Sequence, residues 1–298
     1  MPFQTLTQLK ALLPDLSRSE RHLRDALLYV LETQGSLSRA RLAYSVGCEL
    51  ELPEHRRICL AAGIEFFHVA SLLLDDLPCM DDADTRRGRM CAHRRFGESS
   101  AILAALALIN RAYALLFESF VGLEHASLRE ANHLADDCLG LAGIVNGQAL
   151  DLNFQDGSRD ADAVVRVALL KTGALFRLCL VLPAIVGNAS RYEKMHLSRL
   201  ADVWGVAYQV ADDLKDVLQG ALVTGKNVQQ DETLGRPNLA VLLGVEKATG
   251  ELGRLLGEAD GIVRALSDSE ADRWVGIALF QKEFLTKVEP LLAKQEVA

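Results

Sequence analysis

The chain has 298 residues, half of them hydrophobic, and a formal net charge of −8 at pH 7. This acidic balance argues against nonspecific nucleic-acid binding, which needs clustered Lys and Arg to displace counterions from phosphates. Half-apolar composition supports a large core, and no Pro-, Gly- or Ser-rich linker separates two halves. We therefore expect a single domain over residues 1–298.

The chain start and its apolar runs indicate a soluble, cytoplasmic protein. Residues Met1–Lys10 lack the basic-then-apolar layout of a signal peptide. The run Ala101–Ile109 meets Asn110 and Arg111, short of the roughly 20 apolar residues that span a bilayer. We expect no stable membrane insertion. The dispersed cysteines include no Cys-x-x-Cys pair, so neither a zinc site nor a disulfide framework is indicated.

Apolar residues recur at three- and four-residue spacing through most of the chain, and β-branched runs are few, which predicts an all-α protein. Two polar segments, 79–97 and 219–237, interrupt this pattern and are expected to be loops that carry function. The predicted helices cover residues 20–34, 37–49, 54–78, 98–120, 126–153, 160–186, 193–219, 237–257 and 268–292.

The first acidic cluster begins at the end of the predicted helix 54–78. Asp75 and Asp76 end its apolar run, and Asp81, Asp82 and Asp84 follow within nine residues. Carboxylates this close raise each other's pKa unless cations lie between them. Mg²⁺ suits such a site, because it binds one or two carboxylates together with water and substrate phosphates.

The second acidic cluster lies within the predicted helix 193–219. Gln209, Asp212, Asp213 and Asp216 stand at i, i+3, i+4 and i+7, so they share one face of an otherwise apolar helix. A solvated helix face is the ordinary explanation of an Asp pair, and we assign it to Asp136-Asp137, which has no third carboxylate at helical spacing. The tight spacing and apolar surroundings favour metal binding at both clusters.

Paired cations complete the pattern. Arg86 and Arg87 directly follow the first cluster, and arginines commonly clamp diphosphate oxygens. Metals alone would also fit a phosphatase or a cation store. Metals, paired arginines and a deep apolar interior together indicate a substrate with a diphosphate head and a hydrocarbon tail.

With these residues the sequence resembles the trans-isoprenyl diphosphate synthases, the farnesyl and geranylgeranyl diphosphate synthase family. The matches occur in order over about residues 35–240. The matching motifs are Asp75-Asp76-Leu-Pro-Cys-Met-Asp81 with Arg86-Arg87-Gly88, Gly147-Gln148-Ala-Leu-Asp151-Leu, Lys171-Thr172-Gly173-Ala-Leu-Phe176, and Gln209 with Asp212-Asp213 and Asp216.

The resemblance implies a single-domain isoprenoid synthase fold, with about ten helices around a central substrate cavity, usually in a homodimer. It implies that the two acidic clusters face each other and hold three Mg²⁺ against an allylic prenyl diphosphate. The chief metal ligands implied are Asp75, Asp81 and Asp212, with support from Asp76, Asp213 and Asp216.

The resemblance also assigns the two substrates. The catalytic residues it implies are Asp75, Asp76, Asp81, Lys171, Gln209 and Asp212. The residues implied for the allylic diphosphate are Arg86, Lys171, Gln209 and Lys226. Thr172 and Arg236 are also implied to bind substrate, and Arg236 lies in a lid region where many relatives carry lysine. Those implied for isopentenyl diphosphate are Arg39, Arg41, His68 and Arg87. His68 lies seven residues before Asp75, on the same helix face.

The implied reaction is ionisation, condensation and elimination. Metals and cations stabilise the departing diphosphate, and the double bond of isopentenyl diphosphate attacks the allylic cation. A proton is then transferred to the released diphosphate. Water must be excluded, because it would quench the cation to an alcohol.

One departure concerns isopentenyl diphosphate. The family carries Gly-Gly-Lys-Arg-x-Arg-Pro near its N-terminus, and the corresponding segment 35–42 reads GSLSRARL. Ser38 replaces the lysine and Leu42 replaces the proline, whereas Arg39 and Arg41 match both arginines. The lost ammonium weakens the case for the second substrate.

Two other functions stay open from the sequence. A class I terpene cyclase or diphosphate lyase would keep both acidic clusters without an isopentenyl site, although the retained Arg41, His68 and Arg87 count against it. A non-catalytic subunit of a heteromeric synthase tends to lose one acidic cluster, and both are intact here.

Product length is expected to depend on Ala70 and Ser71, just before the first acidic cluster. In the family, a bulky aromatic five residues before this motif stops growth at fifteen carbons, and Ala70 occupies that position here. With the two-residue insertion Pro78-Cys79, this resembles bacterial geranylgeranyl diphosphate synthases and implies a C20 product.

Overall fold

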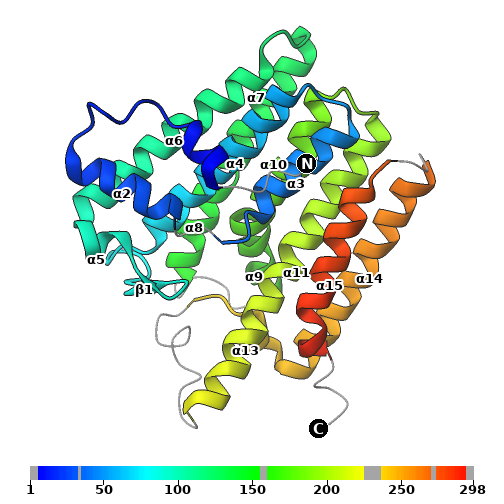
Figure 1. Cartoon of the computed structure of the whole chain (residues 1–298). Coiled ribbons are helices and arrows are strands. Elements are labelled where there is room, and N and C mark those ends of the chain that lie inside the picture. The colour runs from blue at the N-terminus through cyan, green and yellow to red at the C-terminus, as the bar shows by residue number, and fades with distance from the viewer. Residues whose placement is uncertain (1–5, 33–34, 155–159, 225–235, 270–272, 293–298) are drawn as a thin grey trace. The chain divides into compact units, whose positions relative to one another are not determined.

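The computed structural model describes residues 6–32, 35–154, 160–224, 236–269 and 273–292 (Figure 1). Within these ranges the helices and loops include one small hairpin as the only β-structure, which confirms the all-α fold class. The chain divides into two compact units, Met1–Leu128 and Arg129–Ala298, and each is described by itself. The single domain and the central cavity stay predictions.

The first unit is organised around helix α4, Glu54–Asp75. Its run Cys59–Ala70 is buried on every side, so it needs neighbours all round. Helix α6, Glu98–Phe120, packs closely on it: a Cβ added to Gly63 would lie 3.0 Å from the carbonyl oxygen of Ala112, closer than an ordinary contact. The other elements of this unit are α1 Leu6–Ala11, α2 Arg21–Glu32, α3 Ser38–Glu49, β1 Thr85–Arg86, β2 Arg89–Met90, α5 Ala92–Phe96 and α6 Glu98–Phe120.

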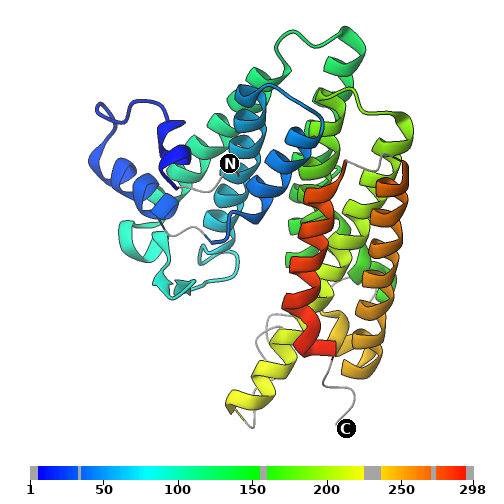
Figure 2. The same cartoon turned by 45° about the vertical axis from the view of Figure 1, so that its right-hand side comes forward.

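The second unit is organised around the long helix α11, Arg191–Thr224. It packs against α10, Ala174–Val186, and α14, Val245–Ser269. Trp204 is fully buried there and donates its indole N–H to Gln281 on α15 at 2.6 Å. Figure 2 shows α11, α14 and α15 running side by side. The elements from the unit boundary onward are α7 His125–Leu139, α8 Ile144–Leu152, α9 Ala161–Ala168, the π-helical segment η2 Leu169–Gly173, α10 Ala174–Val186, α13 Leu239–Leu243, α14 Val245–Ser269 and α15 Val275–Leu292.

The structure corrects four predicted helices. The prediction 268–292 begins too early, because Asp268 and Ser269 end α14 and α15 starts at Val275. The prediction 126–153 is two helices, because the chain turns tightly between Gly140 and Gly143. The prediction 237–257 breaks at Gly244, whose φ of 82° is left-handed and favours glycine. The prediction 160–186 is continuous in direction but contains the π-helical segment, which periodicity alone does not reveal.

Three helical stretches are long and apolar enough to cross a membrane: Glu54–Asp75, Glu98–Phe120 and Ala161–Val186. Because Asn110 and Arg111 lie inside α6, the length argument against membrane crossing was wrong for this helix. Of the most apolar window, 72% is buried inside the protein in the first and third stretches and 39% in α6. The apolar character of the first and third stretches is therefore used mainly by the protein core.

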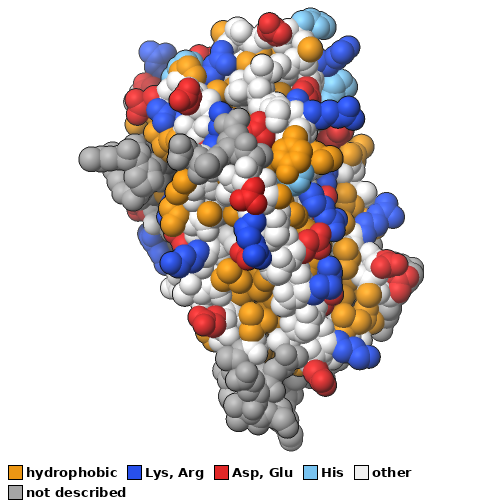
Figure 3. Space-filling model, turned by 90° about the vertical axis from the view of Figure 1, so that its right-hand side faces the viewer, with side chains coloured by type: hydrophobic (Ala, Val, Ile, Leu, Met, Phe, Trp, Pro, Cys, Tyr) orange, Lys and Arg blue, Asp and Glu red, His pale blue; other side chains and the backbone are white. Residues whose placement is uncertain are grey.

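Acidic and basic side chains are interspersed on the face shown in Figure 3. On α14 such charges neutralise one another locally, since Arg254 pairs with Glu251 at 2.6 Å and with Glu258 at 3.1 Å. Exposed pairs of this kind contribute little to stability.

Candidate active site

The first acidic cluster begins where α4 ends. The backbone N–H of Asp81 donates to the carbonyl oxygen of Asp75 at 3.0 Å, so the loop folds back and brings these two residues together. Asp82 follows with a left-handed φ of 46°. Both Asp75 and Asp81 are half-buried, which leaves them accessible to a cation and its water.

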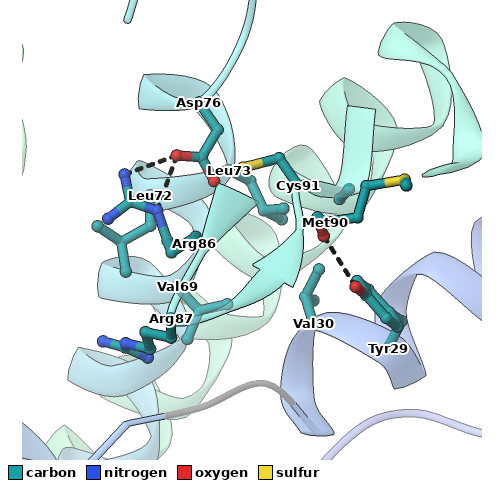
Figure 4. Close-up of a pocket in the computed structure, with 11 residues that line it drawn as sticks. Tyr29, Val30, Val69, Leu72, Leu73, Asp76, Arg86, Arg87, Met90 and Cys91 are labelled. Carbon is teal, nitrogen blue, oxygen red and sulfur yellow. Dashed lines mark hydrogen bonds and ion pairs between the residues drawn. The ribbon is translucent and has the colours of Figure 1, made fainter. Parts of the chain in front are cut away.

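Asp76, in contrast, is buried and held within the protein. Its Oδ1 accepts hydrogen bonds from Nε and Nη2 of Arg86 at 2.7 and 2.6 Å (Figure 4). Burial opposes the charge of Arg86, but this hydrogen bond and the charge of Asp76 outweigh it and raise the pKa of Arg86. Asp76 therefore anchors the hairpin that carries Arg86.

The hairpin β1–β2 was missed from the sequence. Arg87 and Gly88 form its two-residue turn with left-handed φ values of 53° and 73°, the pattern of a type I′ turn. The usual Asn-Gly signal is absent, and strain at a non-glycine residue is typical of functional positions. The hairpin, α2 and α4 line a small pocket, in which Tyr29 donates its hydroxyl to the carbonyl of Met90 at 2.8 Å (Figure 4).

The segment that departs from the family motif lies beside this hairpin. A Cβ on Gly35 would lie 2.8 Å from Cζ of Arg87, so the guanidinium packs directly on that glycine. Nη1 of Arg39 lies 3.1 Å from Nε2 of His68. The structure thus brings together Arg39 with His68, and Arg87 with the start of the segment. Arg41 lies further along α3 and is half-buried.

A buried carboxylate on α4 supports this group. Glu65 is 4% exposed and its Oε2 accepts from the backbone N–H of Ala40, in the first turn of α3, at 3.2 Å. Burial raises the pKa of Glu65, against the charges of Arg39 and Arg87. Burial also lowers the pKa of His68 well below its ordinary 6.5, and the nearby arginines lower it further. Sequence reasoning missed Glu65, whose only signal was a carboxylate inside an apolar helix.

The second acidic cluster lies on α11, on one helical face as predicted. Asp213 is 2% exposed and accepts from the side-chain amide of Gln209 at 2.9 Å and the backbone N–H of Leu239 at 2.7 Å. Asp212 is half-buried and pairs with Lys215 at 2.8 Å, and Asp216 is exposed. In each Asp pair, then, the second residue is buried and held by the protein.

The other predicted residues of this unit lie on η2 and before α13. Thr172 donates its hydroxyl to Gln209 at 3.3 Å. Nζ of Lys171 lies 2.7 Å from Oδ2 of Asp151, and Nη1 of Arg236 lies 3.6 Å from the same oxygen. Asp151 was quoted as part of a motif but not predicted as a site residue. Lys226 lies outside the described residues.

The acidic residues fit Mg²⁺ by donor chemistry. In the part of the chain that the structure describes, no group of three His, Cys, Asp or Glu is close enough to form a ready-made metal site. Mg²⁺ needs fewer protein ligands, because water and substrate phosphates complete its octahedron. The pair Asp75 and Asp81 offers such a partial site, and so does Asp212. The two clusters belong to different units, so their facing each other stays a prediction.

Comparison with known proteins places the chain in a family. Residues 20–269 match the model of the polyprenyl synthetases. Over 185 residues the chain is 40% identical to a geranylgeranyl diphosphate synthase of Pantoea ananas, a match that covers 62% of this chain and 59% of the relative. Over 242 residues it is 34% identical to the farnesyl diphosphate synthase of Escherichia coli K12, covering 80% of each.

Solved structures agree with the sequence relatives. A geranyltransferase from Legionella pneumophila has a TM-score of 0.79 and 25% identity, covering 95% of this chain and 93% of that one. A geranyltransferase from Helicobacter pylori, complexed with magnesium and isoprenyl diphosphate, has a TM-score of 0.78 and 26% identity, covering 97% and 94%. The chain belongs to the polyprenyl synthetase family.

Proposed function

We propose that this chain is a magnesium-dependent trans-prenyltransferase that condenses isopentenyl diphosphate with allylic prenyl diphosphates. The observation that carries the proposal is the difference in burial between the two residues of each Asp pair. Asp76 and Asp213 are buried and held by the protein, whereas Asp75 and Asp212 remain partly exposed beside them. Such a pair fixes one carboxylate so that its neighbour can bind a cation.

The two substrates use different cations. Asp75, Asp81 and Asp212, with outer support from Asp216, would hold up to three Mg²⁺ ions, which would stabilise the charge of the allylic diphosphate electrostatically. The protein cations assigned to that diphosphate are Arg86, Lys171, Lys226 and Arg236, with Thr172 and Gln209 as polar contacts. Arg39, Arg41, His68 and Arg87 are assigned to isopentenyl diphosphate.

The chain's own residues then position the two substrates and stabilise the charge on the departing diphosphate. Lys171 and Arg236 donate hydrogen bonds to the diphosphate as its bond to the allylic carbon breaks, and they stabilise the charge that develops on it. Arg39 and Arg87 hold the diphosphate group of isopentenyl diphosphate, so that the double bond of this substrate reaches the allylic cation. The apolar helices exclude water, and the released diphosphate accepts the proton, so a dedicated protein base is unnecessary.

Product length is assigned to Ala70 on α4, which is fully buried, with Ser71 beside it. The small side chain leaves room for a tail longer than fifteen carbons, and we propose geranylgeranyl diphosphate as the main product. The relatives include both farnesyl and geranylgeranyl synthases, so this length is a finer proposal than the reaction.

A homodimer is proposed on the exposed face of α6. Ile102, Leu106 and Phe117 are 39%, 55% and 52% exposed and recur at helical spacing. A second copy would cover this stripe, so that the assembly is soluble. The proposed location of the enzyme is the cytoplasm. Light scattering after size exclusion tests it: Leu106→Glu should shift the mass toward that of one chain, whereas a wild-type mass of one chain contradicts it.

The function is tested by incubating purified protein and Mg²⁺ with dimethylallyl, geranyl or farnesyl diphosphate, each with and without labelled isopentenyl diphosphate. Elongation predicts label in a longer prenyl diphosphate, lost in excess chelator. Diphosphate release without label would favour the cyclase or lyase, which the missing lysine at Ser38 keeps as the alternative. No release from any substrate would favour a non-catalytic subunit.

A further inference from the structure

One buried carboxylate in the second unit joins two cations from distant segments. Oδ2 of Asp151, on α8, lies 2.7 Å from Nζ of Lys171 on η2 and 3.6 Å from Nη1 of Arg236, which precedes α13. The side chains of Asp151 and Arg236 are only 12% and 10% exposed. The motif that contains Asp151 has no role in the function proposed above.

The charges of this group do not cancel. The three side chains Asp151, Lys171 and Arg236 have a formal net charge of +1, because one carboxylate is shared by two cations. By contrast, the ion pairs Arg177–Asp202 and Arg273–Glu193 in the same unit join one cation to one carboxylate. Two cations held on one carboxylate can donate charge-assisted hydrogen bonds to the same anion, so the group is suited to a diphosphate.

The backbone of Lys171 is fixed by the same face of α8. Gly147 stands one turn before Asp151, and a Cβ on it would lie 2.5 Å from the backbone nitrogen of Lys171. On the other side, Gly205 of α11 is packed equally closely on Gly173. Helix α8 therefore holds Lys171 twice, by backbone contact at Gly147 and by the ion pair at Asp151.

We propose that Asp151 is a positioning residue, which holds Lys171 and Arg236 close enough to engage one diphosphate together. Without the carboxylate the two cations would repel each other and spread apart. The proposal rests on the proposed function, because it takes the ligand to be the allylic diphosphate. Asp151 itself does not touch that ligand, since its negative charge would repel it.

The test is Asp151→Asn, compared with Asp202→Asn as a matched variant of another ion-paired carboxylate. In Asp151→Asn the two cations remain, so attraction to the diphosphate persists, but their geometry is lost. We expect kcat to fall about 10- to 100-fold while KM for the allylic substrate stays unchanged or falls. Asp202→Asn should keep wild-type values for both. Equal kinetics in the two variants overturns the proposal.

A double-mutant comparison with Lys171 distinguishes a positioning role of Asp151 from a purely structural one. If Asp151 acts through Lys171, Asp151→Asn should lower kcat by a smaller factor in a Lys171→Met background than in wild type. Full additivity of the two losses contradicts the proposal. If Asp151→Asn does not fold, Asp151→Glu decides: it keeps the charge but shifts the carboxylate, and a normal kcat in it rejects a positioning role.

Failure of the proposed prenyltransferase function can be distinguished from failure of the proposed role of Asp151. Release of diphosphate from the allylic substrate alone is measured alongside elongation, since Lys171 and Arg236 are assigned to that substrate. If wild type releases diphosphate without elongating, the prenyltransferase proposal fails, and the comparison of Asp151→Asn with Asp202→Asn still decides the role of Asp151.

Discussion

Arg39 and His68 are joined by a hydrogen bond of 3.1 Å between Nη1 and Nε2. A guanidinium has no acceptor, so Nε2 of His68 must accept and the ring proton must sit on Nδ1. The imidazole is therefore neutral here, in agreement with its lowered pKa. His68 orients an arginine of the segment in which lysine is missing, a role that the family pattern did not indicate.

The first prediction concerns stability at acidic pH. Burial, Arg39, Arg87 and Arg86 lower the pKa of His68 in the folded state, whereas the unfolded chain protonates near 6.5. Below that pH the unfolded state binds more protons, so folding stability falls as the pH falls through 6.5 toward the folded pKa. In His68→Gln this loss should be smaller by about 1.4 kcal/mol per pH unit.

Urea unfolding between about pH 7.5 and about pH 5 measures this difference. His55→Gln is the control, because His55 is an exposed residue of the same helix, and its pH dependence should follow wild type. Identical pH dependence of the His68 variant and wild type would show that the buried imidazole titrates normally.

The second prediction concerns the lysine replaced by Ser38. Arg39 is held by His68 beside Glu65, and we expect it to supply the missing phosphate contact. Arg39→Gln should raise KM for isopentenyl diphosphate by about one to two orders of magnitude, the cost of one charge-assisted hydrogen bond. KM for the allylic substrate should change little.

Restoring the lysine tests the same idea in the other direction. Ser38→Lys should lower KM for isopentenyl diphosphate, and it should rescue most of the loss in Arg39→Gln because the two cations serve one phosphate. Arg94→Gln is the control: Arg94 is exposed and pairs with Asp82 and Asp84. An unchanged KM in Arg39→Gln would mean that Arg41 and Arg87 suffice.

The third prediction concerns product length. Ala70 is fully buried on α4, so a larger side chain must displace neighbours or fill space reserved for substrate. Ala70→Tyr should shorten the main product from C20 to C15, measured by chromatography of the dephosphorylated products. The conservative Ala70→Ser should leave it at C20. If Tyr and Ser give the same products, the floor of the tail site lies elsewhere.

Much of the fold follows from the spacing of apolar residues. The helix predicted at 98–120 agrees with α6, and 20–34 and 37–49 agree with α2 and α3 within two residues. The hairpin at Thr85–Met90 was not predicted, because its turn uses a left-handed arginine in place of Asn-Gly. The π-helical segment also escaped, since the residues of α10 that follow it are nearly all apolar and a shift in helical phase cannot be recognised there.

The candidate site was only partly predictable for a related reason. The sequence indicated both Asp pairs but could not say which member of each is buried, since that depends on partners distant in the chain. Asp213 is fixed by the backbone of Leu239, 26 residues away. Glu65 and Asp151 were likewise recognisable only once their partners, Ala40 and Lys171, were located.

The last prediction uses this difference between neighbouring aspartates. Asp213→Ala removes the acceptor of the Leu239 N–H and the Gln209 amide, both in buried surroundings. Leaving such donors unsatisfied costs about 1–3 kcal/mol each. We expect Asp213→Ala to lower the free energy of unfolding, whereas Asp212→Ala should leave it near wild type, because Asp212 is half exposed and its ion pair with Lys215 is a weak surface contact.

Turnover should show the opposite order, with the larger direct effect in Asp212→Ala. Asp212→Ala removes a proposed metal ligand, so turnover should fall by orders of magnitude and saturation should need more Mg²⁺, while the fold stays intact. Asp213→Ala should lose activity mainly in proportion to the fraction unfolded, and lowering the temperature should restore part of it. Denaturant titration and Mg²⁺-dependent kinetics on the two variants measure both effects. Equal losses of stability in Asp212→Ala and Asp213→Ala would contradict the division of roles within the pair.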